Sequence, residues 1–301
     1  MRMIDVDNPL VIYHDNCWDG FCAAWLLHLA YPNAEFFPAQ YGNPPPDVKG
    51  RSVFVVDFSY PRQMTLGMIH DTRGRIVILD HHKTAEEELK DVASLCYKDT
   101  LDQMPWIEFD MNRSGGRMTW EYLCTSNRIV DILLSRGHTM GCGLCRDKAP
   151  WLVDYTEDRD LWRHSLPDTK ELNAYLRSLH RDFDLWDSLS LADESALKVF
   201  ASSGSTILRI QDQVVDHHVS KAYEMEMDGH KILAVNATIH SSEIAGKLAI
   251  GRPFGATYFC QQNQRIWSLR SSHDGIDVSA IAKLRGGGGH ARASGFQERI
   301  N

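Results

Sequence analysis

The stretch Ile76-Val77-Ile78-Leu79-Asp80-His81-His82-Lys83 decides how the first part of the chain is interpreted. Its four apolar residues, three of them β-branched, are typical of a short buried strand. The hydrophobic run then stops at an aspartate and two histidines. A buried strand of a parallel sheet delivers such residues to the carboxyl edge, where α/β proteins bind their ligands. A polar strand end with surface histidines is the alternative reading, which the rest of the chain has to decide.

An earlier segment repeats this layout. Pro9–Tyr13 is a short apolar run, and His14 and Asp19 lie in the polar loop that follows it. Gly20 permits a tight turn into Phe21–Leu29, which has the composition of a helix. Strand, polar loop and helix in this order form the first unit of a doubly wound sheet. The histidine and aspartate of the loop are close enough in sequence to converge on one cation.

A third strand also ends in an acid. Ser52–Val56 is apolar and is followed by Asp57, and Met64–His70 has the pattern of a short helix. Three predicted strands therefore bring carboxylate or imidazole groups to one edge of a sheet. Unrelated solvated strand ends rarely repeat in this way. The recurrence favours a metal site over surface histidines.

The segment Ala149–Trp162 concentrates acidic residues. In a helix, Asp154, Glu157 and Asp158 share one face, because residues three and four apart are neighbours. Like charges in such proximity are unfavourable unless a cation neutralises them. A solvated acidic face is the alternative, but the tryptophans within the segment favour a partly buried site.

Asn112–Leu123 has the pattern of a loop leading into a helix, with Ser114 as the N-cap. Arg113 and Arg117 beside this cap are either phosphate contacts or surface arginines, and the sequence leaves both readings open. Ile129–Leu134 is predicted to continue as helix.

Leu172–Leu189 and Ala196–Met227 are predicted to be helices that link two halves of the chain. The second contains Asp216-His217-His218, which repeats the tripeptide Asp80-His81-His82. Its surroundings are amphipathic and helical. Consecutive residues of a helix point in directions 100° apart, so they do not share one edge. This second tripeptide is therefore predicted to be helix surface.

After residue 230 the pattern changes to short alternating runs typical of strands, with two short helices between them. The predicted strands are Lys231–Val235, Gly255–Cys260 and Gln264–Arg270, and the predicted helices are Ser242–Ala249 and Val278–Leu284.

A glycine run follows the last of these helices. Gly286–Gly289 precedes His290, and Arg292 comes two residues later. Four glycines by themselves are typical of a flexible loop. After a helix and before a histidine and an arginine, they also allow exposed backbone N–H groups to approach an anion closely. A phosphate-binding role is the preferred interpretation.

The whole sequence predicts a two-domain α/β protein: a doubly wound, mostly parallel sheet in the N-terminal domain, joined by helices to a smaller α+β C-terminal domain. Its 301 residues, 43% hydrophobic and 24% charged, suffice for two domains. The net charge of −8 argues against long duplex nucleic acid as a binding partner. No apolar run is long enough to span a membrane, and the acidic start argues against a secretory signal, so we expect a cytoplasmic protein. Cys142-x-x-Cys145 is half a zinc site, a redox pair or, most simply, two reduced thiols.

In the order and spacing of these motifs, the chain resembles the DHH phosphoesterases, and in size and layout their oligoribonuclease (nanoRNase) and cyclic-dinucleotide-type members. The resemblance implies a catalytic domain that binds two Mn²⁺ ions, with Mg²⁺ or Co²⁺ as alternatives. It also implies a DHH-associated domain that binds substrate through a glycine-rich loop. On this basis we expect residues 1–170 to form the catalytic domain, 171–227 a helical linker and 228–301 the substrate domain.

Residue by residue, the resemblance implies three groups of functional positions. His82 faces the substrate. Asp80 orients the imidazole of His81 without being a metal ligand itself. The implied metal ligands are His14, Asp19, Asp57, His81 and Asp158, with Asp154 as the rival of Asp158 and Asp160 as a third choice. The implied substrate-binding residues are Arg270, Ser271, Gly287, Gly288, Gly289, His290 and Arg292.

The first motif departs from the family pattern. Many members have two acids flanking the glycine, whereas Cys17-Trp18-Asp19-Gly20-Phe21 keeps the first acid and has phenylalanine in place of the second. One residue is also inserted after His14. One metal ion therefore has one protein ligand fewer, unless Asp15, Asn16 or a water compensates.

The resulting hypothesis is a metal-dependent phosphodiesterase that cleaves short oligonucleotides or dinucleotides to 5′-mononucleotides. A phosphoanhydride or phosphomonoester hydrolase, acting on polyphosphate or a 3′-phosphonucleotide, is the alternative. A non-catalytic nucleotide-binding module is a third, supported only by the altered first motif. Stacking on Tyr258, Phe259 or Trp267 would favour nucleotides, although core packing is the commoner role of such residues. The sequence leaves open whether the protein forms a homodimer.

Overall fold

The structure is a computed structural model that describes residues 8–15, 17–96, 101–125, 135 and 149–300. The chain divides into two compact units, residues 1–205 (unit 1) and residues 206–301 (unit 2). The division falls within the long helix α9 (Glu194–Val219). The described residues contain no helix that is both long and apolar enough to cross a membrane.

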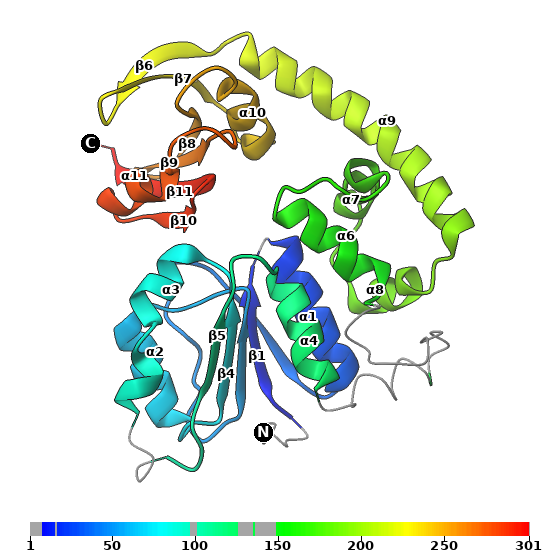
Figure 1. Cartoon of the computed structure of the whole chain (residues 1–301), viewed down its shortest axis with the longest axis vertical. Coiled ribbons are helices and arrows are strands. Elements are labelled where there is room, and N and C mark those ends of the chain that lie inside the picture. Colours follow the sequence, from blue (N-terminus) through cyan, green and yellow to red (C-terminus); the bar gives the residue numbers. More distant parts are fainter. Residues whose placement is uncertain (1–7, 16, 97–100, 126–134, 136–148, 301) are drawn as a thin grey trace. The chain divides into compact units, whose positions relative to one another are not determined.

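Unit 1 is built on a five-stranded parallel sheet with the order β2-β1-β3-β4-β5 (Figure 1). The order reverses between β1 and β3, which is the position at which open α/β sheets bind ligands. The strands are β1 (Leu10–His14), β2 (Glu35–Ala39), β3 (Val53–Val56), β4 (Ile76–Asp80) and β5 (Trp106–Phe109).

Helices cover both faces of this sheet (Figure 1). Alternate residues of β1 point to opposite faces, so Val11 packs in one core while Leu10 and Ile12 pack in the other. This double coverage explains why the central strands are uninterrupted apolar runs. The first face carries α1 (Trp18–Ala30), α4 (Gly115–Cys124), α6 (Trp151–Asp160), α7 (Thr169–Arg177) and α8 (Phe183–Ser190); the second carries α2 (Arg62–Asp71), α3 (Lys83–Leu89) and the 3₁₀ turn Val92–Leu95.

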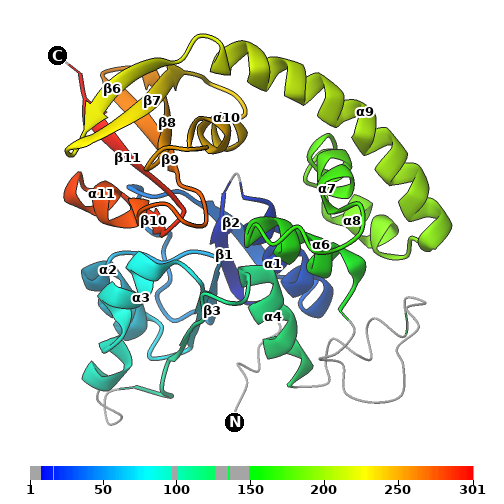
Figure 2. The same ribbon diagram turned by 45° about the horizontal axis from the view of Figure 1, so that its top comes forward.

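Unit 2 contains a six-stranded mixed sheet with the order β10-β11-β9-β8-β7-β6 (Figure 2). Only β7 and β8 pair in parallel. Helix α10 (Ser241–Leu248) and helix α11 (Val278–Leu284) pack in separate apolar clusters against it. The strands are β6 (Tyr223–Met227), β7 (His230–Asn236), β8 (Gly255–Gln261), β9 (Gln264–Arg270), β10 (Gly288–His290) and β11 (Ala293–Arg299).

The fold class expected from the sequence, a two-domain α/β protein with a parallel first sheet, is confirmed. The second Asp-His-His tripeptide lies in helix α9, also as predicted. The predicted helix Ala196–Met227 is wrong at its end, because Tyr223–Met227 forms β6. Asp228 and Gly229 both have positive φ angles, of 50° and 77°, and form the tight turn that returns β6 onto β7.

Strands β2, β5, β10 and β11 and helix α3 were not among the predicted elements. The predicted helix at residues 129–134 and the cysteines at 142 and 145 lie outside the described residues. The interdomain borders inferred from the resemblance stay predictions.

Candidate metal centre

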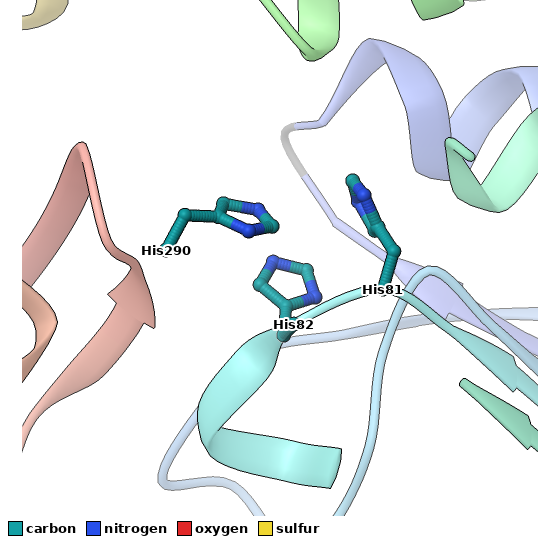
Figure 3. A group of neighbouring side chains, drawn as sticks. All are labelled: His81, His82 and His290. Atoms are coloured by element: carbon teal, nitrogen blue, oxygen red, sulfur yellow. The ribbon is translucent and has the colours of Figure 1, made fainter. Parts of the chain in front are cut away.

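The carboxyl ends of three neighbouring parallel strands meet at one edge of the sheet in unit 1. His14 is the last residue of β1, Asp57 follows β3, and Asp80 is the last residue of β4. His81 and His82 come directly after β4, at the start of α3 (Figure 3). The structure therefore brings together the side chains that the strand-end pattern singled out.

Asp57 lies at the centre of this group and is fully buried. Its Oδ1 lies 3.0 Å from Nε2 of His81, and its Oδ2 lies 3.5 Å from Nδ1 of His14. Burial opposes ionisation of this carboxyl, but the two imidazoles outweigh it and hold the pKa of Asp57 well below its ordinary value. The backbone is also unusual, since φ is 54°, in the left-handed region. Such a conformation costs about 1–3 kcal/mol and is concentrated at functional sites.

The imidazole of His81 faces three carboxylates. Its Nε2 lies 3.0 Å from Asp57, 3.5 Å from Oδ2 of Asp160 and 3.7 Å from Oδ2 of Asp19. Burial lowers the pKa of His81, but the Asp57 carboxylate and the charges of Asp160 and Asp19 raise it more, so that it ends well above the ordinary value. The ring is in an environment that strongly favours positive charge.

Helix α4 holds the carboxylate of Asp19 by its first two amides. Gly115 N–H donates to Oδ2 at 2.5 Å, and Gly116 N–H donates to Oδ1 at 3.0 Å. A Cβ atom at position 115 would lie 2.6 Å from Cβ of Asp57, so glycine is required for this approach. Burial raises the pKa of Asp19 well above its ordinary value, and Asp57 and Asp160 raise it further.

Asp80 positions His82 rather than the ring of His81. Its Oδ1 lies 2.6 Å from Nδ1 of His82 and also accepts the backbone N–H groups of both histidines, at 2.8 and 3.3 Å. Its Oδ2 accepts from the hydroxyl of Ser59 at 2.6 Å. Asp80 is fully buried, so this network fixes the His82 ring and the turn that carries His81. The expected role of Asp80 in orienting the His81 ring is therefore replaced by one on His82.

Asp160, and not the expected Asp158, lies beside His81. Asp158 turns to the following loop, where its carboxylate accepts from Ser165 N–H at 2.9 Å, from Ser165 Oγ at 2.6 Å and from Leu166 N–H at 3.3 Å. Two residues along a helix is a rotation of 200°, so Asp160 points the opposite way. The candidate for the last acidic ligand therefore moves from Asp158 to Asp160.

The other acids of α6 neutralise an arginine. Arg117 pairs with Asp154 and, at 3.1 Å, with Glu157. Arg113 pairs with three carboxylates, those of Glu108, Asp110 and Glu121. These ion pairs favour the structural reading of both arginines over the phosphate-binding one. The predicted N-cap Ser114 is confirmed, since its hydroxyl accepts from Arg117 N–H.

Phe21, which stands where the DHH phosphoesterases that the first motif resembles have a second acid, faces away from this centre. It is 4% exposed and stacks on Phe183 with a centroid distance of 5.0 Å. Its edge also meets Trp186 at 5.1 Å. Position 21 lies 200° around α1 from position 19, so Asp19 points to the centre and Phe21 packs in the core.

These residues form two groups of donors in unit 1 that fit divalent cations. Ligand atoms of His14, Asp57 and His82 lie within 4.8 Å of one another, and so do those of Asp19, His81 and Asp160. Among the described residues, Oδ2 of Asp57 and Oδ2 of Asp160 are buried without a hydrogen-bond partner. Imidazole with carboxylate is a donor set that Mn²⁺ accepts, and a cation would neutralise the crowded acids.

Unit 2 contains the residues expected to bind substrate, several of which make internal contacts. Arg270 donates to Ser242 Oγ at 2.6 Å, and the Ser271 hydroxyl donates to Ile276 O at 2.7 Å. Arg292 is exposed and donates to the carbonyls of Gly275 and Ile276. The Ser271 and Arg292 contacts hold the loop 271–277, and the Arg270 contact joins β9 to α10.

The glycine run is an ordered part of the unit 2 sheet. Gly288–His290 is β10, at whose end His290 lies (Figure 3). A Cβ atom at Gly287 would lie 2.1 Å from the carbonyl oxygen of Gly295, and Gly289 has a φ of 133°. Close packing on β11 therefore requires glycine at these positions. Trp267 is 4% exposed and packs with Phe296, which supports the core reading of this aromatic residue.

Sequence reasoning missed three contributors to the centre. Gly115 and Gly116 supply the amides that hold Asp19, and Ser59 holds Asp80. A serine N-cap followed by two glycines was the available signal for an exposed helix N-terminus. Nothing in the sequence placed that terminus beside Asp19, because 96 residues separate the two partners.

No protein-family model matches the chain. The chain is 26% identical over 319 residues to the uncharacterized protein R106 of Acanthamoeba polyphaga mimivirus, covering 95% of this chain and 66% of that protein. It is 26% identical over 230 residues to the oligoribonuclease NrnB of Bacillus subtilis (strain 168), covering 74% of this chain and 52% of that protein. The chain thus spans between half and two thirds of the length of these relatives.

Solved structures with a similar course of the chain include three bacterial proteins. An uncharacterized protein from Helicobacter pylori G27 is 14% identical with a TM-score of 0.40, covering 98% of this chain and 93% of that one. The pGpG-specific phosphodiesterase PggH from Vibrio cholerae is 13% identical with a TM-score of 0.42, covering 97% and 94%. An exopolyphosphatase-related protein from Bacteroides fragilis is 12% identical with a TM-score of 0.45, covering 96% and 86%.

Proposed function

We propose that the chain is a metal-dependent phosphodiesterase of DHH type that hydrolyses short oligonucleotides or dinucleotides to 5′-mononucleotides. The observation that carries the proposal is the buried cluster in which His81 faces Asp19, Asp57 and Asp160. Its oxygen and nitrogen donors fit Mn²⁺, with Mg²⁺ or Co²⁺ as alternatives. The sequence similarity to an oligoribonuclease supports the class of substrate.

Two sets of residues in unit 1 would hold the cations. One consists of His14 and Asp57, beside which His82 lies, and the other of Asp19, His81 and Asp160. Asp57 would be available to both sets, because its two oxygens face His81 and His14. Divalent ions bound in such a site lower the pKa of a coordinated water and neutralise the phosphate oxygens during an in-line displacement.

The protein's own contribution is to hold these side chains rigidly. The helix α4 amides fix the Asp19 carboxylate, and Asp80 fixes the His82 ring through Nδ1. Because Nδ1 of His82 is held by Asp80, the other ring nitrogen, Nε2, points in one fixed direction. His82 would use that orientation to stabilise charge on the phosphate or to protonate the leaving oxygen.

Substrate binding by unit 2 remains part of the proposal. Arg270, Ser271, Arg292, His290 and the glycines at 287–289 would contact a phosphate or nucleotide. The net charge of −8 favours a small substrate over a long strand held by electrostatic attraction.

The test is hydrolysis of a 5′-labelled RNA dinucleotide and pentanucleotide by the purified protein with Mn²⁺ and with EDTA. We expect Mn²⁺-dependent release of mononucleotides that His81→Ala abolishes. His70→Ala is the matched control, because His70 lies on α2 with its side chain 84% exposed. The absence of cleavage of both RNAs would contradict the proposal and direct the assay to polyphosphate and 3′-phosphonucleotides.

A further inference from the structure

Tyr41 lies beside two histidines of the candidate centre in unit 1. It follows β2, whose last residue Ala39 pairs with His14 at the carboxyl edge of the sheet. Between centroids, the Tyr41 ring is 5.3 Å from the ring of His14 and 6.2 Å from that of His82, and it meets both edge-on, at 74° and 79°. The residue is nevertheless 54% exposed. An aromatic ring that is open to solvent thus stands next to the imidazoles.

Two kinds of contact hold Tyr41 in this place. Its ring packs on that of Phe58 at 4.7 Å between centroids, and Phe58 is a core residue that is 1% exposed. The side-chain amide of Gln40 donates to Asp15 at 2.7 Å, and Asp15 N–H donates to the carbonyl of Ala39 at 2.8 Å. Asp15 therefore ties the start of the Tyr41 loop to the end of β1. A ring held in this way loses little conformational freedom when it binds a ligand.

The chemistry of this ring decides what it is suited to bind. A phosphate is bound by charged groups and N–H donors, whereas the face of a phenol ring is neutral and stacks on other flat rings. In a nucleotide a single sugar joins the phosphate to the base. A phosphate bound beside His14 and His82 would therefore carry its base close to the Tyr41 ring. Polyphosphate has no flat group that would use this ring.

Isolated exposed aromatic residues are common on protein surfaces and by themselves indicate nothing. Tyr41 differs from such residues in its surroundings. Its neighbours are the imidazoles of His14 and His82 on one side and the buried ring of Phe58 on the other. The ring is thus fixed against the core, exposed to solvent and adjacent to the groups that would act on a phosphate.

We propose that Tyr41 is a stacking platform for one nucleobase of the substrate, so that the site in unit 1 selects nucleotides over polyphosphate. The inference rests on the proposed function and names the part of the substrate that Tyr41 recognises. Every base has a π-face, so stacking of this kind is tolerant of sequence. Tyr41 would therefore require a base without selecting which base it is.

Equilibrium binding of a dinucleotide tests this inference without measuring activity. Two probes carry 2-aminopurine on the 5′ or the 3′ side and uracil on the other, because the fluorescence of 2-aminopurine is quenched when it stacks on an aromatic ring. A methylene group replaces the 3′ bridging oxygen, whose bond to phosphorus breaks when a 5′-mononucleotide is released. The probes therefore stay intact with Mn²⁺, which is present in every titration so that any quenching by the ion is common to all variants.

The full chain is compared with Tyr41→Phe and Tyr41→Ala. Leu191→Ala is the matched control, since it removes an apolar side chain of unit 1 that is also about half exposed, at 52%, after α8. Isothermal titration calorimetry gives the affinity for each probe and for an abasic version that lacks the 2-aminopurine base. Circular dichroism shows that each variant retains the fold.

We expect the full chain, Tyr41→Phe and Leu191→Ala to quench 2-aminopurine in one of its two positions. Tyr41→Ala should lose this quenching and bind that probe about tenfold more weakly. The corresponding abasic version should bind equally to the full chain and to Tyr41→Ala. Retained quenching and affinity in Tyr41→Ala would overturn the platform, and so would a loss in Tyr41→Phe as large as in Tyr41→Ala, which would assign the effect to the hydroxyl.

The RNA hydrolysis assay of the proposed function separates the two conclusions. Release of mononucleotides by the full chain, together with probe binding that does not depend on Tyr41, would remove the platform and leave the phosphodiesterase standing. If the full chain neither cleaves RNA nor binds the probes, both are overturned.

Discussion

At the scale of single residues, the side-chain directions on α6 decide which acid belongs to the candidate centre. Asp158 is satisfied by three donors of the loop after the helix, whereas Oδ2 of Asp160 lies 3.5 Å from Nε2 of His81. A carboxylate with its own donors contributes to stability, and one without them is suited to bind a cation. The two acids therefore have different expected phenotypes.

Asp160→Asn should weaken Mn²⁺ binding by at least about tenfold, since second-sphere changes alone cost this much in metal sites. Isothermal titration calorimetry measures the affinity directly. Asp158→Asn is the matched control, and we expect it to keep its Mn²⁺ affinity. The reverse ranking of the two variants would restore Asp158 as the ligand.

Asp158→Asn should instead lower the free energy of unfolding, by about 1.5–3 kcal/mol for the loss of hydrogen bonds to a charged group. Burial raises the pKa of Asp158, but the Ser165 and Leu166 donors outweigh it and leave the pKa below its ordinary value. A lowered carboxyl pKa stabilises the protein above the unfolded-state value, and that contribution is lost as the pH falls through the folded-state value. The stability difference between wild type and Asp158→Asn, from urea unfolding, should therefore shrink at acidic pH. A difference independent of pH would contradict this role.

Phe21→Asp introduces the second acid of the DHH pattern that the first motif resembles, and it tests whether this position can serve a metal ion. Because Phe21 packs between Phe183 and Trp186, the aspartate would bury an unpaired charge. We expect a loss of several kcal/mol in unfolding free energy and no gain in Mn²⁺ affinity. Phe21→Leu, which keeps the position apolar, should cost less unfolding free energy than Phe21→Asp. Tighter Mn²⁺ binding by Phe21→Asp would show that the side chain reaches the centre.

At the scale of elements, the N-terminus of α4 is the part that holds the acids in place. Its first two amides donate to Asp19, and the absence of side chains at Gly115 and Gly116 lets Asp19 and Asp57 approach the helix. The element therefore acts on the centre through its backbone amides.

Gly115→Ala should disturb this approach, because the added Cβ would lie 2.6 Å from Cβ of Asp57 and 3.1 Å from Oδ2 of Asp19. We expect a loss of about 1–3 kcal/mol in unfolding free energy and weaker Mn²⁺ binding. Gly67→Ala is the matched control within α2, where an added Cβ meets nothing within 4 Å. That variant should gain about 0.5–1 kcal/mol from helix propensity. Equal effects of the two substitutions, measured by chemical unfolding, would argue against the close approach.

At the scale of the whole molecule, the chain is two units with separate cores, and the candidate cations are confined to the first. The crowding of Asp19, Asp57 and Asp160 around His81 is a cost that unit 1 carries in the absence of a cation. Metal binding should therefore be linked to the stability of unit 1 and not of unit 2.

Mn²⁺ at about one hundred times its dissociation constant should stabilise unit 1 by about 2.7 kcal/mol, and EDTA should reverse the effect. Hydrogen exchange measured by mass spectrometry reports the two units separately. We expect slower exchange in strands β1, β3 and β4 with Mn²⁺ and unchanged exchange in the core strands β8 and β9. Uniform protection of both units, or none, would contradict a metal site confined to unit 1.

The sequence by itself determined the two-domain α/β fold and the edge at which the candidate site lies. Both follow from local signals, since uninterrupted apolar runs identify buried strands and the polar residue after each run marks its carboxyl end. His14, Asp57 and His81 were found in this way. The uninterrupted apolar run before the first Asp-His-His tripeptide and the amphipathic helical pattern around the second also separated the one at the end of β4 from its copy in α9.

Only the tertiary structure decided which acid of α6 faces the centre, where Phe21 points, and that Gly115 and Gly116 hold Asp19. Helical periodicity defines which residues share a face, but the direction of that face depends on how the helix packs against the rest of unit 1. Asp158 and Asp160 are both aspartates of α6, and they differ only in the direction in which the helix turns their side chains. The contacts that decide it join residues far apart in the chain, and no local pattern encodes their meeting.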